Sequence, residues 1–181
     1  MSSGYDSKRH DERDEVCKRR GKKIYHVFHG DDAEIKFLPR GDSRDLEQGI
    51  DYIVVKNNEE ILCSDRLRKA FTKKGVNLCE LNDITIRTKS KDGTPLEMYT
   101  SKARYFLYAI ENEAKDDWCR AYLVDMQKTK EHFLNNDFSC KEIQNDDGNY
   151  FAIIGVPELQ SYGLILKKYP PEEPKELCDW Y

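Results

Sequence analysis

The sequence predicts an α+β fold, built mainly on an antiparallel sheet, with one well-capped helix over residues 65–74 and one or two further helices. Short runs of β-branched and aromatic residues recur between turn signals that contain Gly, Asn or Asp, as in antiparallel sheets. The block DYIVVKNNEEILCSDRLRKAFTKKGVNLCELNDITI, residues 51–86, combines a strand, a capped helix and a second strand in one compact unit. With 181 residues, including seven Phe, eleven Tyr and two Trp, the chain is large enough to bury one core.

Composition divides the chain into a flexible, charged N-terminal arm, residues 1–23, and a single α+β domain, residues 24–181. The arm holds eight Lys or Arg and five Asp or Glu but few apolar residues, a composition that does not support a packed core. Ordered structure is therefore expected to begin at Ile24.

Three strands are expected before the predicted helix, because β-branched and aromatic residues favour strands. They cover residues 24–29, 34–38 and 52–56. Paired Asp and Asn residues supply the turns that follow the first and the third of these strands, at Asp31-Asp32 and Asn57-Asn58.

The helix predicted over residues 65–74 depends on its capping and its apolar spacing. Ser64 is a favourable N-cap. Leu67, Ala70 and Phe71 have the i, i+3 and i+4 spacing of a buried helical stripe. A glycine, residue 75, follows the last turn, as is typical of a left-handed C-cap.

Beyond this helix the pattern predicts mostly antiparallel strands. A tight turn is expected at residues 91–94 and a further helix over residues 127–134. The expected strands cover residues 76–81, 84–89, 96–100, 103–110, 122–124, 150–154 and 164–166.

The sequence predicts a cytoplasmic protein. Its N-terminus has no apolar segment of the kind that export signals carry, and its apolar runs are too short to cross a bilayer. No close pair occurs among the six cysteines, so we expect all of them to be thiols in a reducing cytosol. They are Cys17, Cys63, Cys79, Cys119, Cys140 and Cys178.

No motif predicts a catalytic, metal or cofactor site, so a non-enzymatic protein is expected. His26 and His29 lie three residues apart, and in a strand they would point to opposite faces. The sequence contains no C-x-x-C pair and no glycine-rich phosphate loop. A small enzyme with an unrecognised Cys/His or carboxylate site stays an alternative; it predicts a deep pocket lined by groups with strongly perturbed pKa values.

Acidic residues concentrate in the C-terminal part of the chain. Residues 111–181 hold fifteen Asp or Glu against eight Lys or Arg, within a net charge of -4 for the whole chain. Such a surface attracts a basic partner and repels nucleic acid. Aromatic anchors beside charged residues are typical of interfaces. These observations define the expected partner-contact group, Glu111, Glu113, Asp116, Asp117 and Trp118.

Two alternatives stay open, one for the acidic group and one for the N-terminal arm. Aromatic residues near this group can belong to the core, with the acids as a solubilising rim or as turn formers. The basic run Lys18 to Lys23 can make the arm an RNA- or ribosome-associated module, which predicts binding that weakens steeply with salt. Neither a membrane nor a nucleic acid is the expected partner.

The block of residues 51–86, followed by ARYFLYAIENEAKDDW, resembles the immunity-protein families of bacterial polymorphic toxin systems. The similarity covers about residues 48–125 and includes a helix unit and a later Tyr-rich strand with its loop. The matching residues are Ser64, Arg66, Leu67, Gly75, Tyr105, Phe106, Asn112, and Asp116 or Asp117. The resemblance implies a single α+β domain in the cytoplasm that binds a cognate protein toxin and blocks it, usually by covering the toxin's active site.

Overall fold

A computed structural model describes residues 23–39, 42–72 and 74–171 and shows an α+β fold, as the sequence predicts. Apart from Lys23, the expected N-terminal arm lies outside the described residues. In chain order, the elements are α2 (Lys23–His29), β1 (Glu34–Phe37), α3 (Ser43–Gln48), β2 (Tyr52–Lys56), β3 (Glu59–Arg68), the 3-10 helix η1 (Leu78–Glu80), β4 (Asp83–Lys89), α4 (Glu97–Thr100), β5 (Tyr105–Glu111), β6 (Trp118–Asp125), α5 (Met126–Leu134), β7 (Lys141–Gln144), β8 (Tyr150–Gly155), α6 (Val156–Ser161) and β9 (Ile165–Tyr169).

The strands form two sheets. A six-stranded sheet has the order β1-β2-β3-β5-β6-β9, and a three-stranded sheet has the order β4-β8-β7. Every pairing is antiparallel except that of β3 with β5. The expectation of a mainly antiparallel sheet is therefore confirmed.

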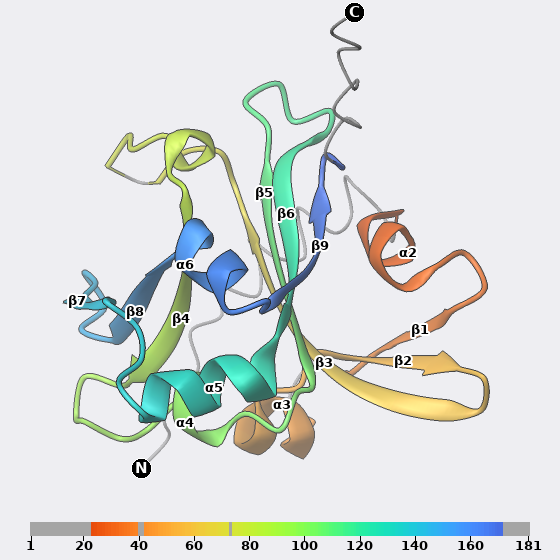
Figure 1. The fold of residues 1–181 in the computed structure, drawn as a ribbon, viewed down its shortest axis with the longest axis horizontal. Coiled ribbons are helices and arrows are strands. Elements are labelled where there is room, and N and C mark those ends of the chain that lie inside the picture. Colours follow the sequence, from red (N-terminus) through yellow and green to blue (C-terminus); the bar gives the residue numbers. More distant parts are fainter. Residues whose placement is uncertain (1–22, 40–41, 73, 172–181) are drawn as a thin grey trace, which may run out of the picture.

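The six-stranded sheet is the middle layer of the molecule, with α2 on one side and the three-stranded sheet on the other (Figure 1). Successive side chains of β5 point to opposite faces of the sheet, and each face contributes to a separate hydrophobic cluster. Leu107 and Ala109 pack in the cluster that contains α2, whereas Phe106, Tyr108 and Ile110 pack in the cluster that contains β4, β8 and α6. Because β5 is buried on both faces, its sequence is almost continuously apolar.

Several predicted elements agree with the structure. The strands expected near residues 34–38, 52–56, 103–110 and 150–154 correspond to β1, β2, β5 and β8, and the helix expected over residues 127–134 corresponds to α5. Asn57 and Asn58, with φ values of 53° and 61°, form the expected turn between β2 and β3. Positive φ at both central residues suits the twist of a two-residue hairpin.

The helix predicted over residues 65–74 is wrong, because β3 continues as a strand to Arg68. β3 pairs with β2 over residues 59–63 and with β5 over residues 63–68. These ladders use its backbone groups, and tertiary pairing overrides the local helical spacing. Ser64 is thus a buried strand residue rather than an N-cap.

The strand expected over residues 24–29 is also wrong, because this segment is the helix α2. Ile24, Tyr25 and Phe28 lie on one helical face and pack against the six-stranded sheet. The two histidines therefore share a helix, yet each has its own partner: His26 Nδ1 lies 3.2 Å from the Gly30 carbonyl oxygen, and His29 Nε2 lies 3.1 Å from a tyrosine hydroxyl.

Further differences concern short elements. Residues 78–80 form η1 and residues 97–100 form α4, where the sequence predicts strands. The short elements α3, β7 and α6 were not predicted, since four to six residues carry little periodic signal.

The expectation that all six cysteines are thiols is wrong for one pair, because Cys79 and Cys119 form a disulfide. Cys63 is a buried thiol and Cys140 a half-buried one. Cys17 and Cys178 lie outside the described residues. In the part of the chain that the structure describes, no helix has the length and apolar character needed to cross a membrane.

Candidate functional site

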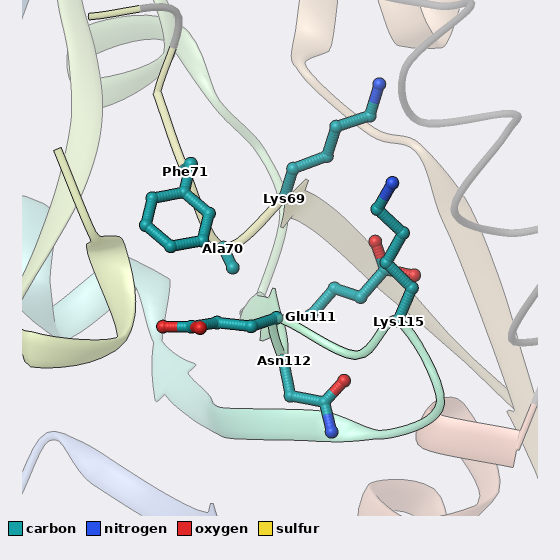
Figure 2. Close-up of a pocket in the computed structure, with 7 residues that line it drawn as sticks. Lys69, Ala70, Phe71, Glu111, Asn112 and Lys115 are labelled. Atoms are coloured by element: carbon teal, nitrogen blue, oxygen red, sulfur yellow. The ribbon is translucent and has the colours of Figure 1, made fainter. Parts of the chain in front are cut away.

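A notch of about 210 Å³ lies where β3 and β5 end. The two strands are parallel, with Arg68 opposite Ile110, so their last residues reach the same end of the sheet. The chain that leaves β3 and the turn that leaves β5 then face one another (Figure 2). The notch is lined by Lys69, Ala70, Phe71, Glu111, Asn112, Glu113 and Lys115.

Three apolar side chains are exposed on the segment that leaves β3, residues 69–82. Phe71 and Val76 are each 47% exposed, and Leu81 is 37% exposed. Phe71 lies at the notch, where its ring stands next to Ala70 (Figure 2). Exposed apolar residues that share one short segment are more informative than scattered ones, because such patches mark interaction sites.

The 69–82 segment folds back on itself through a tight turn. The Thr72 backbone N–H donates to the Val76 carbonyl at 3.0 Å, and Phe71 pairs with Asn77. Gly75 adopts a φ of +77°, a conformation in which a side chain would be strained. The predicted left-handed backbone at this glycine is correct, but it serves this turn and not a helix end.

The turn between β5 and β6 is organised by Asn112. Its side-chain oxygen accepts hydrogen bonds from the backbone N–H groups of Asp116 at 3.1 Å and Asp117 at 3.3 Å. Asp117 Oδ1 in turn accepts from the Trp118 backbone N–H at 2.8 Å. Asp116 and Asp117 are therefore turn formers, one of the alternatives that the sequence left open, although both stay exposed.

Two residues of the expected partner-contact group lie in the interior, which corrects that part of the prediction. Glu111 has 0% exposure and lies at the floor of the notch, below Phe71 in the view of Figure 2. Trp118 is 8% exposed and packs in the core that contains α2. Only Glu113, Asp116 and Asp117 of the group are available to a partner.

The charges around the notch are mixed. Lys69 and Lys115 point away from its floor on the same side (Figure 2), and Glu113 supplies a negative charge to the lining. Glu113 accepts a hydrogen bond of 2.9 Å from the Asn77 side chain, so the acid also ties the 69–82 segment to the β5–β6 turn. The rim is thus a set of charged side chains of both signs around an apolar centre.

A half-buried disulfide and a buried hydrogen bond hold the 69–82 segment against the six-stranded sheet. The Cys79–Cys119 disulfide joins η1 to β6, with its Cα atoms 6.0 Å apart. Next to it, Arg120 Nη2 donates a hydrogen bond of 2.6 Å to the Leu78 carbonyl. The segment that carries the exposed apolar residues is therefore positioned before any partner arrives.

A second group of titratable side chains lies inside the molecule, between α2 and the six-stranded sheet. Burial lowers the pKa of His29 to about 4 and raises the pKa of the Cys63 thiol to about 12. Tyr52, which bonds to His29, also has its pKa raised by burial. A thiol kept protonated in this way is a poor nucleophile, so the group favours a role in stability.

The residues that the structure describes include no group of three His, Cys, Asp or Glu side chains arranged to hold a metal ion.

Sequence reasoning missed the exposed aromatic residue of the notch, Phe71. Phe71 has helical spacing from Leu67, so it was assigned to a helix core. The polar turn Thr72 to Gly75 was the available signal, because it also fits a turn between two extended chains. No local signal identified the Cys79–Cys119 pair, whose members are 40 residues apart in sequence.

The sequence matches no family model, and comparisons with curated proteins and with solved structures gave no match.

Proposed function

We propose that this protein is a non-enzymatic inhibitor of the immunity-protein type, which binds a cognate protein toxin through the notch and the 69–82 segment. The observation that carries the proposal is the exposure of Phe71 at a notch with a charged rim, together with the exposure of Val76 and Leu81 on the same segment. Protein interfaces combine an apolar or aromatic centre with a polar rim, and a few central anchors supply most of the binding energy.

The positioning of the segment supports the same proposal. A surface that is fixed before binding loses less conformational entropy when its partner docks. The disulfide to Cys119 and the hydrogen bond from Arg120 to the Leu78 carbonyl both fix it. Phe71 therefore presents its ring as a rigid anchor.

The proposed partner is basic. Residues 111–181 carry a strong excess of acid. Glu113 lines the notch, and the exposed Asp116 and Asp117 lie on the same β5–β6 turn. Complementary charge raises the association rate and helps to select the partner. Glu111 and Trp118 contribute to this surface only by supporting it from inside.

A cytoplasmic location is part of the proposal. Cytosolic reductants keep most protein thiols reduced, so Cys79 and Cys119 would spend part of their time there as thiols. How firmly the disulfide fixes the proposed surface therefore depends on the redox state of the compartment.

The test begins with a partner captured from the native cell, which must be toxic when expressed alone and harmless when co-expressed with this protein. Phe71→Ala should then weaken the affinity about 10- to 100-fold, or by about 1.4–2.8 kcal/mol, as measured by calorimetry. Leu134→Ala is the matched control, because Leu134 is an apolar residue with 51% exposure at the end of α5. Equal affinities for the Phe71 variant and the wild type would contradict the proposed surface, and a captured protein without toxicity would contradict the immunity function.

A further inference from the structure

The Cys79–Cys119 disulfide lies directly beneath the proposed binding surface. Cys79 belongs to η1, within the 69–82 segment, and Cys119 is the second residue of β6. Cys79 Sγ lies 3.6 Å from the Glu111 carbonyl oxygen, at the floor of the notch. Both cysteines are half-buried rather than enclosed in the core, so we expect small thiols to reach the bond.

Few other contacts attach the 69–82 segment to the rest of the described structure. Among its described residues, Leu78 is the one buried side chain in a hydrophobic core cluster, and the Leu78 carbonyl accepts the bond from Arg120. At the end of the segment, the Asn82 carbonyl accepts a hydrogen bond of 2.9 Å from the Val156 backbone N–H. The Asn77–Glu113 hydrogen bond and the Lys74–Asp146 ion pair both lie at the exposed surface, where they contribute little. Segments with few buried contacts open locally at low free-energy cost.

We propose that Cys79–Cys119 is a thiol–disulfide exchange site, and that its reduction releases the 69–82 segment from β6 and loosens the surface that carries Phe71. The exchange site follows from the position of the disulfide alone. Its effect on toxin binding rests on the proposed function, because only a partner that docks on this segment would sense the change.

The chemistry needs a low-molecular-weight thiol such as glutathione. Its thiolate attacks one sulfur of the disulfide, forms a mixed disulfide and releases the other cysteine as a thiolate, which takes up a proton. A second thiol molecule then displaces the first cysteine. In sum, one protein disulfide and two thiols give two protein thiols and one small disulfide, a two-electron exchange that oxidised glutathione reverses.

The two free cysteines of the described structure differ from the disulfide pair because neither lies at the notch. Cys63 is buried, and burial raises the pKa of its thiol to about 12. Cys140 is half-buried on the segment before β7, where burial also raises the pKa of its thiol. Cys140 is therefore the matched control for a cysteine change away from the notch.

Hydrogen–deuterium exchange of the full-length protein, read by mass spectrometry, tests the proposal without a partner. After dithiothreitol treatment, peptides covering residues 70–82 should exchange at least about tenfold faster than in the oxidised protein, because opening of the segment limits their exchange. A peptide from β8 should not change and serves as the internal reference. In oxidised glutathione, mass mapping should recover Cys79 linked to Cys119.

Two variants complete the experiment. The double variant Cys79→Ser/Cys119→Ser should exchange at the fast rate with or without dithiothreitol, whereas Cys140→Ser should respond to dithiothreitol as the wild type does. Equal rates for residues 70–82 in the oxidised and reduced wild type would overturn the proposal, as would a different partner for either cysteine. Neither result would touch the toxin-binding proposal, which the Phe71 variant tests separately.

Discussion

His29 is the residue whose ionisation bears most directly on stability. Its side chain is buried at the end of α2, where Nε2 lies 3.1 Å from the Tyr52 hydroxyl. Burial is the main cause that lowers its pKa from 6.5 to about 4, and the charges of Lys167, His26 and Lys56 act in the same direction. Lys56 and Lys167 are held there because they donate to backbone carbonyls at the end of α2, at 3.2 and 2.6 Å.

The low pKa of His29 predicts a loss of stability in acid. Between pH 6.5 and about 4 the unfolded chain binds a proton at His29 that the native protein does not bind. This contribution is therefore complete above pH 6.5, and it should fall by about 3 kcal/mol as the pH decreases to 4. Urea unfolding of the wild type and of His29→Gln at several pH values measures it. The variant should show the shallower fall, and parallel profiles would contradict the assignment.

At the scale of elements, one buried hydrogen bond joins the two segments that local sequence assigns wrongly. The Tyr25 hydroxyl of α2 donates to Asp65 Oδ2 of β3 at 2.7 Å. The Asp65 backbone N–H donates to Asp51 Oδ2 at 2.8 Å, which connects the pair to the residue before β2. This contact requires residues 24–29 to be helical and residue 65 to lie in a strand that faces them.

Removal of the Tyr25 hydroxyl should therefore destabilise the protein. Tyr25→Phe leaves a buried carboxylate oxygen of Asp65 without this donor, and hydrogen bonds to charged groups contribute about 1.5–3 kcal/mol. Urea unfolding should show a loss of that size. Tyr162→Phe is the control, because its hydroxyl bonds to the Asp137 carbonyl at the exposed surface. If both variants lose less than about 0.5 kcal/mol, α2 does not dock on β3 in this way.

The elements that the sequence predicts correctly share one property: tertiary burial and local preference agree. The run at β5 is buried on both faces, so its apolar continuity signals a central strand without further context. β3 differs because it contains Asp65 and Arg66, whose side chains bond to Tyr25 and Glu97 on elements far away in the sequence. A short stretch of sequence carries no sign of such distant partners. Prediction from that stretch therefore follows the helical spacing of Leu67 and Phe71.

At the scale of the whole molecule, the candidate site depends on how two distant segments meet, namely the chain after β3 and the turn after β5. The acids near residues 111–117 were identified from composition, and Glu113, Asp116 and Asp117 are indeed exposed. The burial of Glu111 and Trp118 depends on the packing of the six-stranded sheet, and no single-sequence pattern distinguishes them from their exposed neighbours. The apolar centre at Phe71 becomes visible only when the end of β3 is placed beside β5.

The two sheets are joined by an ion-pair cluster that spans their interface. Arg66 of β3 lies in the six-stranded sheet and donates from Nη2 to Glu97 Oε2 of α4 at 2.8 Å. Arg87 of β4 lies in the three-stranded sheet, with Nε 3.5 Å from the same oxygen. The Arg66 guanidinium also lies over the Phe151 ring of β8, at 5.2 Å from its centroid. One carboxylate thus pairs with two arginines, one from each sheet.

Glu97→Ala should accordingly weaken the docking of one sheet on the other. It leaves Arg66 and Arg87 without their counter-ion, and loss of one partner from a buried pair costs about 3–5 kcal/mol. Asp146→Ala removes the exposed ion pair with Lys74 and should cost less than about 1 kcal/mol. Urea unfolding followed by circular dichroism compares the two variants. Similar small losses of unfolding free energy in both variants would mean that apolar packing alone holds the sheets together. A large loss for Glu97→Ala alone would show that its carboxylate stabilises the contact between the sheets.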